Sequence, residues 1–413
     1  MRIHRASDVT SRAGPRVGLV EEVSAIIHEV LRGGDDAVLS LTERFDRAEV
    51  GPGELRVDPR ELEAAVGVLE PDVLRGLRTA IENVRSVARA QLRDPVAVEL
   101  QQGHAVEIVE IPVRRAAIYA PGGRAPYPST VVMGAITARV AGVEQIVVCA
   151  PPGPGGRAHP VILAACVLCE VSEVYRMGGA QAIAALAYGT ESVSPVDVIA
   201  GPGNSYVQEA KRQVAFTMVG IDGVAGPSEL AIVADGAGAD PELVALDLLA
   251  QAEHGPDSQL WLSSPDAGFR EAVIARVEDL APQRPSVAEA KLQIMQFAAA
   301  AALEIFEDIA PEHLELVGEN AEALADRVRC AGCLFVGTGA ATAFGDYVAG
   351  SNHVLPTGGA ARFQSALSPA TFRRRMARVS LPGEAPARLA SAGTALARAE
   401  GFPVHAESME RRG

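Results

Sequence analysis

The chain has two kinds of hydrophobic pattern, and one gives way to the other near residue 113. Apolar residues recur at helical spacing among many charges over residues 16–46 and 59–93, with the breaker-rich stretch "EVGPGELRVDP" between them. Beyond residue 113, short apolar runs typical of buried strands alternate with helical segments. Four such strand-then-helix units follow one another, which predicts a parallel sheet with right-handed crossovers.

A second alternating run follows the first, and the boundary falls near "DGVAGPSE" at residues 222–229. The expected strands of the first run cover residues 113–120, 145–150, 172–177 and 196–200. Those of the second run cover residues 229–234, 258–264, 291–296 and 333–337. From residue 363 onward the pattern is helical, and we expect this segment to be loosely attached.

These patterns predict an α/β protein with two Rossmann-like parallel-sheet domains, each an incomplete dinucleotide-type fold, and helical segments at both ends. The expected parts are a helical N-terminal region (1–112) packed on the second α/β domain, a first α/β domain (113–226), a second α/β domain (227–365) and a helical C-terminal segment (366–413).

Charge and composition narrow the class of protein. The 413 residues include 37 basic and 52 acidic side chains, a net charge of −15, which argues against binding to nucleic acid or to a membrane surface. No apolar run approaches the roughly 18 residues of a transmembrane helix. The start "MRIHRASDVTSRAG" lacks the apolar core of a secretory signal, so we expect a cytoplasmic protein.

The spacing of two C-x-x-C pairs resembles that of a four-thiolate zinc site. Cys166 and Cys169 form the first pair, and Cys330 and Cys333 form the second. Their surroundings, "VILAACVLCEV" and "RCAGCLFVG", read as a buried helix and the entry to a buried strand. Neither has the polar, turn-rich frame of a zinc knuckle, so we interpret these cysteines as core residues.

Glycine-rich turns mark the places where a ligand is expected. Open α/β sheets bind ligands at the carboxyl ends of their strands, and we assign to those ends the turns "YAPGG", "GGAQ", "AGPGN", "AGPSE" and "GSNHVLPTGG". The G-x-G-x-x-G dinucleotide fingerprint is absent, since "GPGNSYV" has Val207 at the third glycine position. The turns still offer backbone amides for a phosphate or carboxylate, although any one of them could simply be a tight turn.

Acidic and imidazole side chains cluster in the second half of the chain. Gln251 and His254 lie three residues apart and share one face of a helix, which alone is weak evidence for a metal. Glu312 and His313 are adjacent after a proline, a pair suited to proton transfer. The remaining candidates are Asp346 and His353 in a Gly-rich loop, and Glu400 and His405 near the C-terminus. Four of the eight histidines thus lie beside an acid or an amide, which favours a functional cluster over capped surface turns.

Taken in order, the motifs of the chain resemble those of the histidinol dehydrogenase family. They are "YAPGG", "GGAQAIAALAYGT", "GPGNSYVQEAK", "AGPSE", "QAEHGPDSQ", "APEHLEL" and "GDYVAGSNHVLPTGG". The resemblance runs from about residue 116 to residue 408. The first 110 residues are similar only in helical character, and the Ala-rich stretch 281–306 matches poorly.

The resemblance implies zinc- and NAD-dependent oxidation of L-histidinol to L-histidine through the aldehyde. Its implied zinc ligands are Gln251, His254, Asp346 and His405, a mixed N and O set that suits Zn²⁺. Its implied acid/base pair is Glu312 and His313. The substrate would be contacted by Ser228, His353 and Glu400 together with His313 and the four zinc ligands. The implied NAD-binding positions are Tyr119, Gln181 and Asn204.

The resemblance also implies roles for these residues and a partner. His313 would remove the hydroxyl proton, Glu312 would activate the water that hydrates the aldehyde, and zinc would anchor the imidazole and amino group of the substrate. The family implies a homodimer in which the C-terminal segment of each chain completes the partner's site. Zinc and the catalytic residues would belong to the second α/β domain, and NAD to the first.

Three other functions remain open at this point. A related zinc/NAD dehydrogenase could oxidise another small alcohol, such as a sulfonated propanediol, although Glu400 beside His405 favours histidinol. A zinc hydrolase could use Glu312 to activate water and would need no NAD. A non-catalytic binding protein would leave the adjacent Glu312 and His313 unexplained.

Overall fold

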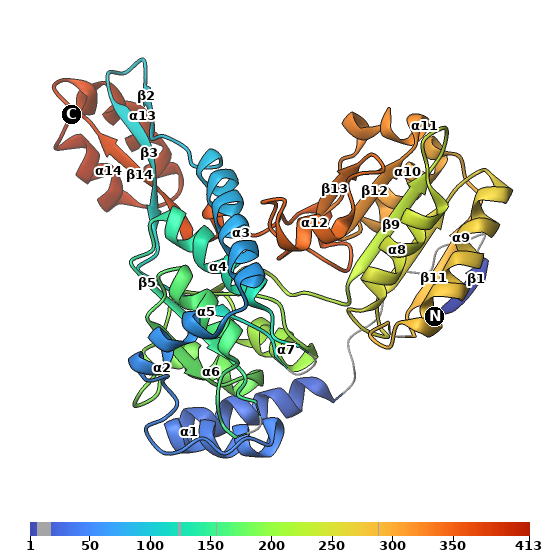
Figure 1. Cartoon of the computed structure of the whole chain (residues 1–413). Helices are drawn as coiled ribbons and strands as arrows, with labels where there is room; N and C mark the ends of the chain where they lie inside the picture. Colours follow the sequence, from blue (N-terminus) through green and yellow to red (C-terminus); the bar gives the residue numbers. More distant parts are fainter. Residues whose placement is uncertain (6–17, 123–124, 154, 288) are drawn as a thin grey trace.

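The computed structural model of the chain describes residues 1–5, 18–122, 125–153, 155–287 and 289–413. The chain forms two α/β lobes, each built on a parallel sheet between helices, and a projecting arm (Figure 1). The two parallel sheets confirm the fold class that the alternating pattern predicts. Among the helices of the described residues, none combines the length and apolar character needed to cross a membrane.

The first lobe is built on a five-stranded parallel sheet in the order β6-β5-β4-β7-β8. Its strands are β4 (Arg115–Tyr119), β5 (Gln145–Ala150), β6 (Glu173–Arg176), β7 (Val198–Ala200) and β8 (Gly220–Ile221). Its helices are α4 (Pro128–Ala141), α5 (Pro160–Leu168), α6 (Gly179–Tyr188) and α7 (Ser205–Val214). In β4, Ala116 and Ile118 join the apolar core of α4 and α5, whereas Ala117 and Tyr119 join that of α6 and α7. Because both faces are covered, β4 is apolar at nearly every position.

The N-terminal helices pack on the first lobe, so the prediction that residues 1–112 pack on the second was wrong. Helix α1 (Leu19–Asp46) lies along α6 and α7, α2 (Pro59–Ala64) beside α5, and α3 (Pro71–Ala90) along α4. The apolar stripe of α1 enters the core of α6, and helical periodicity reveals such a stripe without revealing what covers it. In the described part of this region, only β1 (Arg2–Arg5) joins the second sheet, beside β11.

Helix α1 is bent at Gly34, which has a φ of 54° and a ψ of −135°. Residues with a side chain rarely adopt this positive φ, so the bend favours glycine. The first two residues of the helix predicted at 16–46 lie outside the described residues.

The second lobe is built on a six-stranded parallel sheet in the order β1-β11-β10-β9-β12-β13. Its further strands are β9 (Glu229–Ala234), β10 (Gln259–Ser263), β11 (Lys291–Met295), β12 (His313–Val317) and β13 (Cys333–Val336). Its helices are α8 (Pro241–Ala252), α9 (Ala267–Leu280), α10 (Ala299–Ile309), α11 (Glu319–Glu322) and α12 (Thr342–Tyr347). Helices α8 and α9 cover one apolar core and α10 covers another, which contains the fully buried Trp261. The order places β9 directly beside β12, far apart in sequence.

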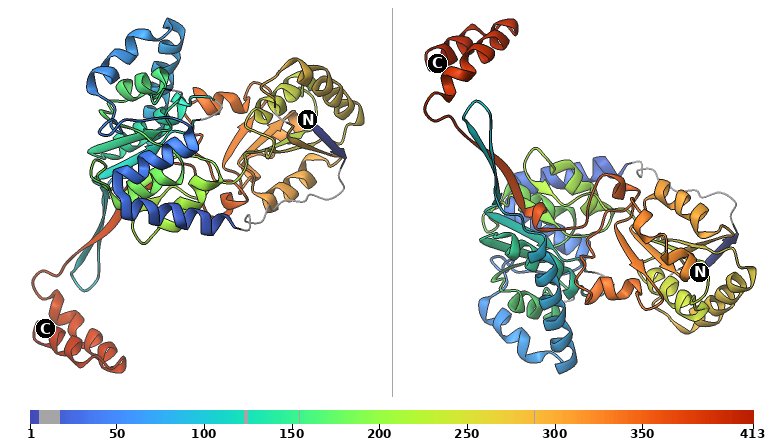
Figure 2. Two further views of the ribbon diagram at one scale, coloured as in Figure 1. Left: turned by 90° about the horizontal axis from the view of Figure 1, so that it is seen from below. Right: turned by 90° about the horizontal axis from the view of Figure 1, so that it is seen from above.

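The arm consists of an antiparallel sheet, β14-β3-β2, and the two C-terminal helices (Figure 2). Its strands are β2 (Val96–Glu99), β3 (Ala105–Pro112) and β14 (Arg373–Ser380), and its helices are α13 (Ala385–Ala399) and α14 (Pro403–Glu410). The sequence predicted only helices for 1–112 and 366–413, so these three strands correct it. Charged pairs such as Arg378 with Glu107 line β14 and β3, and such exposed strands carry no apolar alternation to detect.

The two C-x-x-C pairs differ in their surroundings. Cys166 and Cys169 are fully buried in the first lobe, where burial raises the pKa of the Cys169 thiol to about 12. Cys330 and Cys333 are partly exposed at the start of β13. All four are free thiols, and the first pair is core, as we interpreted it.

Candidate active site

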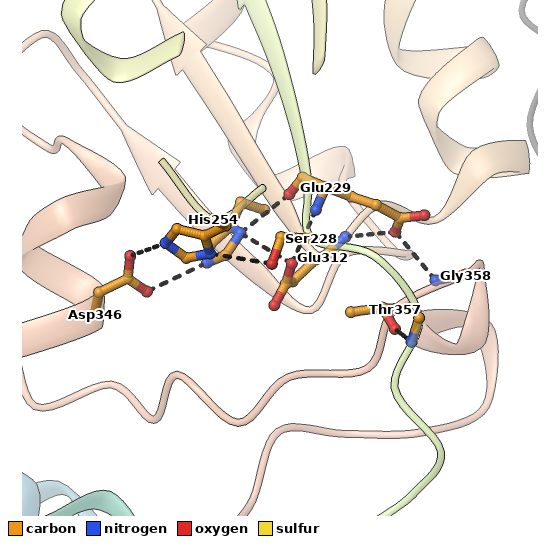
Figure 3. A network of polar contacts seen from close by, with 9 residues as sticks. Ser228, Glu229, His254, Glu312, Asp346, Thr357 and Gly358 are labelled. Carbon is orange, nitrogen blue, oxygen red and sulfur yellow. Dashed lines mark hydrogen bonds and ion pairs between the residues drawn. The ribbon is translucent and has the colours of Figure 1, made fainter. Parts of the chain in front are cut away.

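The predicted catalytic residues of the second lobe gather at the amino edge of its sheet, where β9 and β12 begin (Figure 3). Helix α8 follows β9 and runs back to this edge before β10 starts, so its last turn ends there. We expected "AGPSE" at a carboxyl end, and this was wrong because the motif precedes β9 instead of following a strand. The elements that reach the edge carry Ser228, Glu229, Gln251, His254, Glu312 and His313.

Glu229 and Glu312 face each other, and each carboxylate accepts a hydrogen bond from the backbone amide of the other. Glu229 N donates to Glu312 Oε2 over 2.9 Å, and Glu312 N donates to Glu229 Oε2 over 3.3 Å (Figure 3). Burial and the neighbouring Glu312 charge raise the pKa of Glu229 to about 7. Burial raises the pKa of Glu312 to about 7, although His313 opposes the shift. Glu312 can therefore exchange a proton near neutral pH.

His313 is oriented by a backbone carbonyl. Its Nδ1 lies 3.0 Å from the carbonyl oxygen of Glu229, which only accepts, so Nδ1 carries the hydrogen. Its Nε2 lies 3.7 Å from Asp346 Oδ1. Burial disfavours the imidazolium, but Glu312 and Asp346 outweigh burial and raise the pKa of His313 to about 9. Nε2 is thus the nitrogen on which a proton can be gained or lost.

Asp346 of α12 lies between two imidazoles, those of His254 and His313. Gln251 lies in the last turn of α8, and His254 lies in the turn that follows this helix and not on it. Asp346 Oδ2 is 4.0 Å from His254 Nε2, and burial lowers the pKa of His254, which favours the neutral, metal-binding form. Gln251 is 1% exposed, and its Nε2 has no hydrogen-bond partner in the described part of the chain. Burying an amide without a hydrogen-bond partner costs free energy, so such an amide indicates a place where a ligand binds.

Ser228 and His353 contact two residues of the same cluster, His254 and Asp346. Ser228 Oγ lies 3.0 Å from His254 Nδ1. His353 Nδ1 lies 2.8 Å from the carbonyl oxygen of Asp346, and its Nε2 lies 3.1 Å from Thr130 Oγ1. Because Thr130 belongs to α4, His353 joins the loop after α12 to the first lobe.

Glu400 and His405 are not brought to this group within one chain. Glu400, directly after α13, and His405, on α14, are both exposed, and these helices lie at the far end of the arm (Figure 2). His405 contacts Phe402, with ring centroids 5.3 Å apart. Among the residues that the structure describes, no three His, Cys, Asp or Glu side chains form a group able to hold a metal ion. Two of the four predicted zinc ligands fall outside such a group, because Gln251 is an amide and His405 lies on the arm.

The predicted NAD residues line one cavity of about 1250 Å³ in the first lobe, which Tyr119, Gln181 and Asn204 share. The cavity lies beyond the carboxyl ends of β4, β5, β6 and β7, where the strand order reverses and ligands of open α/β sheets bind. Gln181 is buried, and its Nε2 lacks a partner among the described residues. Asp46 also lines this cavity, and its Oδ2 is buried and has no hydrogen-bond partner among the described residues.

Helix N-termini surround this cavity. His159, Gly179 and Asn204, at the starts of α5, α6 and α7, all line it. Tyr119 Oη accepts a hydrogen bond from Gly179 N over 3.1 Å, and Asn204 Oδ1 caps α7. At Gly201, a Cβ atom would meet the backbone of Tyr119, so the turn after β7 can approach β4 only with glycine. Converging N-termini favour an anionic group such as a diphosphate.

Sequence reasoning missed Glu229, which is 5% exposed and touches the Glu312 amide. A signal existed: Glu229 directly follows Ser228, and a carboxylate that opens an otherwise apolar strand is rarely buried without a purpose. Asp46 and Thr130 were also missed, and neither carries a comparable signal, because each reaches its site only through the packing of a helix.

Comparison with known proteins gives one consistent result. A family model described as histidinol dehydrogenase matches residues 12–413, so the similarity extends well into the first 110 residues. The chain is 41% identical to histidinol dehydrogenase of Gluconobacter oxydans, over 98% of this chain and 96% of that protein. It is 45% identical to that of Parasynechococcus marenigrum, over 94% and 90%. The crystal structure of histidinol dehydrogenase from Elizabethkingia anophelis superposes with a TM-score of 0.93 at 31% identity, covering 100% of this chain and 98% of that one.

Proposed function

Since the chain belongs to the histidinol dehydrogenase family and is therefore an oxidoreductase, we propose that it oxidises L-histidinol to L-histidine through histidinal, using zinc and NAD. The observation that carries the proposal is the contact of Glu312 and His313 with each other and of His313 with Asp346 at one buried edge. This edge holds a carboxyl group that titrates near pH 7 beside an imidazole with a fixed hydrogen position.

The residues present fit a zinc ion. Gln251 is buried, and its Nε2 has no hydrogen-bond partner among the described residues. Exchanging the amide nitrogen and oxygen by a half rotation would place the oxygen, a zinc ligand, at that position. His254 is held in its neutral form by burial, while neighbouring imidazoles keep the pKa of Asp346 low despite its own burial. We propose that Gln251, His254 and Asp346 hold zinc together with His405 of a second chain, a set of two oxygens and two nitrogens.

The cavity of the first lobe fits NAD. Its volume, the three helix N-termini and the Gln181 Nε2, which has no partner in the part of the chain that the structure describes, together suit a dinucleotide with a central diphosphate. Tyr119, Gln181 and Asn204 would hold it. When bound, NAD would accept hydride and zinc would anchor the imidazole and amino group of the substrate.

We propose the following roles for the side chains of the protein. His313 Nε2, once it has released the proton that its raised pKa retains at neutral pH, takes the hydroxyl proton of the alcohol, while the Glu229 carbonyl keeps the ring oriented. Glu312, which titrates near pH 7, draws a proton from the water that adds to the aldehyde. After His313 has released this first proton to solvent, its Nε2 takes the hydroxyl proton of the hydrated aldehyde in the second oxidation. Ser228 and His353 position the substrate beside His254 and Asp346.

We propose that the protein is a homodimer in which each arm completes the partner's site. Glu400 and His405 are exposed at the far end of the arm of their own chain, and this placement supports delivery to a second chain (Figure 2). A two-fold axis makes such an exchange reciprocal.

A substrate panel tests the proposal. Histidinol with NAD should yield two NADH per molecule, read at 340 nm, whereas sulfonated propanediol and other amino alcohols should yield none. Chelation should abolish NADH formation and zinc should restore it, since the metal anchors the substrate. His254→Ala should lose bound zinc, measured by elemental analysis, and His28→Ala, an exposed histidine on α1, should keep it. Absence of NADH from histidinol with zinc present would refute the proposal, as would zinc binding by His254→Ala at wild-type affinity.

A further inference from the structure

We propose that Lys211 and Asp222 are positioning residues for the cofactor: their ion pair holds the turn 201–204 in the form that receives NAD. The inference rests on the proposed function, in which Tyr119 and Asn204 hold NAD in the cavity of the first lobe. The described lining of that cavity includes neither Lys211 nor Asp222, so both act through the turn.

The turn after β7 lies directly against a residue of the cavity. Gly201 has a φ of 124°, a conformation that residues with a side chain rarely adopt. A Cβ atom at Gly201 would lie 2.2 Å from the carbonyl oxygen of Tyr119, so the two backbones approach closely. Three residues later, Asn204 caps α7 and lines the same cavity as Tyr119. A shift of this turn would therefore move Asn204 relative to Tyr119.

The ion pair binds both backbone groups of Gly201. Gly201 N donates to Asp222 Oδ2 over 2.8 Å, and Lys211 Nζ donates to the Gly201 carbonyl oxygen over 3.0 Å. Lys211 Nζ also donates to Asp222 Oδ1, which joins the two partners of the turn to each other. Gly201 is buried, so the loss of either partner would leave a backbone group unsatisfied. The pair therefore fixes the first residue of the turn by its amide and by its carbonyl.

The burial of this pair favours a positioning role. The side chains of Lys211 and Asp222 are 1% and 5% exposed. Replacing a buried ion pair by apolar side chains of similar volume is often neutral or stabilising, so stability alone does not explain this one. Lysine is also rare in the chain, because Lys211 is one of only two lysines among 37 basic residues. A compact ammonium with three rotatable donors suits a site where one cation serves a carbonyl and a carboxylate at once.

Asp222 also begins the linker 222–228, which connects the two lobes. Gln208 Oε1, on α7, accepts from Ala225 N over 2.7 Å. The linker is thus attached at two points to α7, the helix that the turn precedes. It ends at Ser228, a proposed substrate contact. The same ion pair therefore fixes both the cofactor turn and the start of the segment that leads to the substrate site.

Arg115 and Glu173 offer a matched control in the same sheet. Their ion pair is also largely buried, with side-chain exposures of 6% and 19%. It lies at the amino ends of β4 and β6, whereas the cavity lies beyond the carboxyl ends of these strands. Arg115→Met leaves a carboxylate without its cation, as Lys211→Met does, but leaves the turn untouched. The two substitutions therefore separate the loss of a buried ion pair in general from the loss of this one.

The experiment measures the binding of NAD and, separately, of histidinol to zinc-loaded full-length protein by isothermal titration calorimetry. Lys211→Met should raise the Kd of NAD about tenfold, the equivalent of about 1.4 kcal/mol of lost preorganisation. The Kd of histidinol should stay within about twofold, because Thr357 and Gln259 still hold the far end of the linker. In turnover, the loss should fall on the KM of NAD more than on kcat. Arg115→Met should keep the Kd of NAD within about twofold of the wild-type value.

A second variant separates positioning from stability. Lys211→Met combined with Asp222→Asn removes the unpaired buried charge, so its thermal unfolding temperature should return toward that of wild type. The combined variant still offers an oxygen to Gly201 N but no donor to the Gly201 carbonyl, so its affinity for NAD should stay low. A purely structural role would restore both properties together.

The outcomes are distinguishable. If wild type binds no NAD, the proposed function fails. If wild type binds NAD and both Lys211 variants bind it as tightly, the inference about the ion pair is wrong. An equal loss of NAD affinity in Arg115→Met would also overturn it. Should Lys211→Met fail to fold, the combined variant decides, and its own failure to fold would overturn the inference because the pair would then serve the fold instead.

Discussion

At the scale of single residues, backbone carbonyls decide what the histidines of the site can do. His313 Nδ1 donates to the Glu229 carbonyl and His353 Nδ1 donates to the Asp346 carbonyl. The Nε2 of His313 therefore faces Asp346, and the Nε2 of His353 faces Thr130. The tautomer of His313 is set by the fold before any substrate arrives, which suits a proton acceptor.

Substitutions of Glu312 and of His313 should affect the two oxidations differently. Glu312→Gln should slow histidinal oxidation by about 10²–10⁴-fold and histidinol oxidation much less, because only the aldehyde needs an activated water. His313→Asn should slow both, since each step removes a hydroxyl proton. NADH formation from each substrate, started separately, measures this. Equal losses from Glu312→Gln on both substrates would contradict the division of roles.

At the scale of elements, the pairing of α8 with β12 brings the site together. Alternation along β12 places His313, Glu315 and Val317 on the α8 side of the sheet, with Leu314 and Leu316 in the opposite core. Glu315 is hydrogen-bonded to Asp247, which lies one turn before Gln251 on α8. This bond holds α8, which carries Gln251 and leads into the turn with His254, against the strand that carries His313.

The Asp247–Glu315 pair should make stability depend on pH. Burial raises the pKa of Asp247 to about 6 and that of Glu315 well above its ordinary value. The folded chain then binds protons here more tightly than the unfolded chain, whose carboxyls titrate near pH 4. The free energy of unfolding should therefore fall as pH rises from about 4 through about 6.

Urea unfolding at pH 4 to 7 measures this contribution. In Glu315→Gln, the free energy of unfolding should fall between pH 4 and pH 7 by about 1–2 kcal/mol less than in wild type. This figure is reduced for the partial exposure of Asp247. Glu319→Gln, an exposed carboxyl just after β12, should keep the wild-type dependence. The assignment is wrong if Glu315→Gln loses stability with pH as steeply as wild type.

At the scale of the whole molecule, the arm projects away from both lobes, which supports the proposed exchange with a second chain (Figure 2). Helices α13 and α14 pack on each other at the end of the β3–β14 ribbon, away from both lobes (Figure 2). Leu396, Phe402 and Val404 on them are exposed, and apolar exposure of this kind is typical of an interface. Their neighbours Glu400 and His405 are the two proposed site residues that lie on the arm, away from the cluster in the second lobe.

Mixed dimers should reveal whether the arm acts in the partner. His254→Ala and His405→Ala should each be inactive alone, because each lacks a zinc ligand. In a mixed dimer with exchanged arms, one site collects both lesions and the other is intact. Random pairing makes half of the dimers mixed, so about a quarter of wild-type activity should return.

The measurement is NADH formation after co-refolding the two variants, with native mass spectrometry to count mixed dimers. If every site used its own arm, each would keep one lesion and no activity would return. Mixed dimers without activity would therefore reject the exchange. Co-refolding His254→Ala with wild type serves as the reference for recovery.

Much of the fold could be predicted because local periodicity reports burial. The apolar runs at 113–120 and 229–234 are covered on both faces, and such runs identify strands of a parallel sheet without knowledge of their neighbours. The polar side chains of the site could be singled out for a similar reason, since Glu312 and His313 are chemically conspicuous where they stand.

Only the tertiary structure decided which remote segments meet. The stripe on α1 fits either lobe in principle, and its packing against α6 is a property of two surfaces, not of one helix. The exposed strands β3 and β14 are paired by backbone bonds and by charges such as Arg378 with Glu107, neither of which leaves a periodic trace. The sequence by itself thus determined the two parallel α/β lobes and the chemistry of the site residues. The fold decided that the site lies at the amino edge of β9 and β12, that Glu229 stands against Glu312, and that His405 lies on a distant arm, because each depends on contacts between segments far apart in the chain.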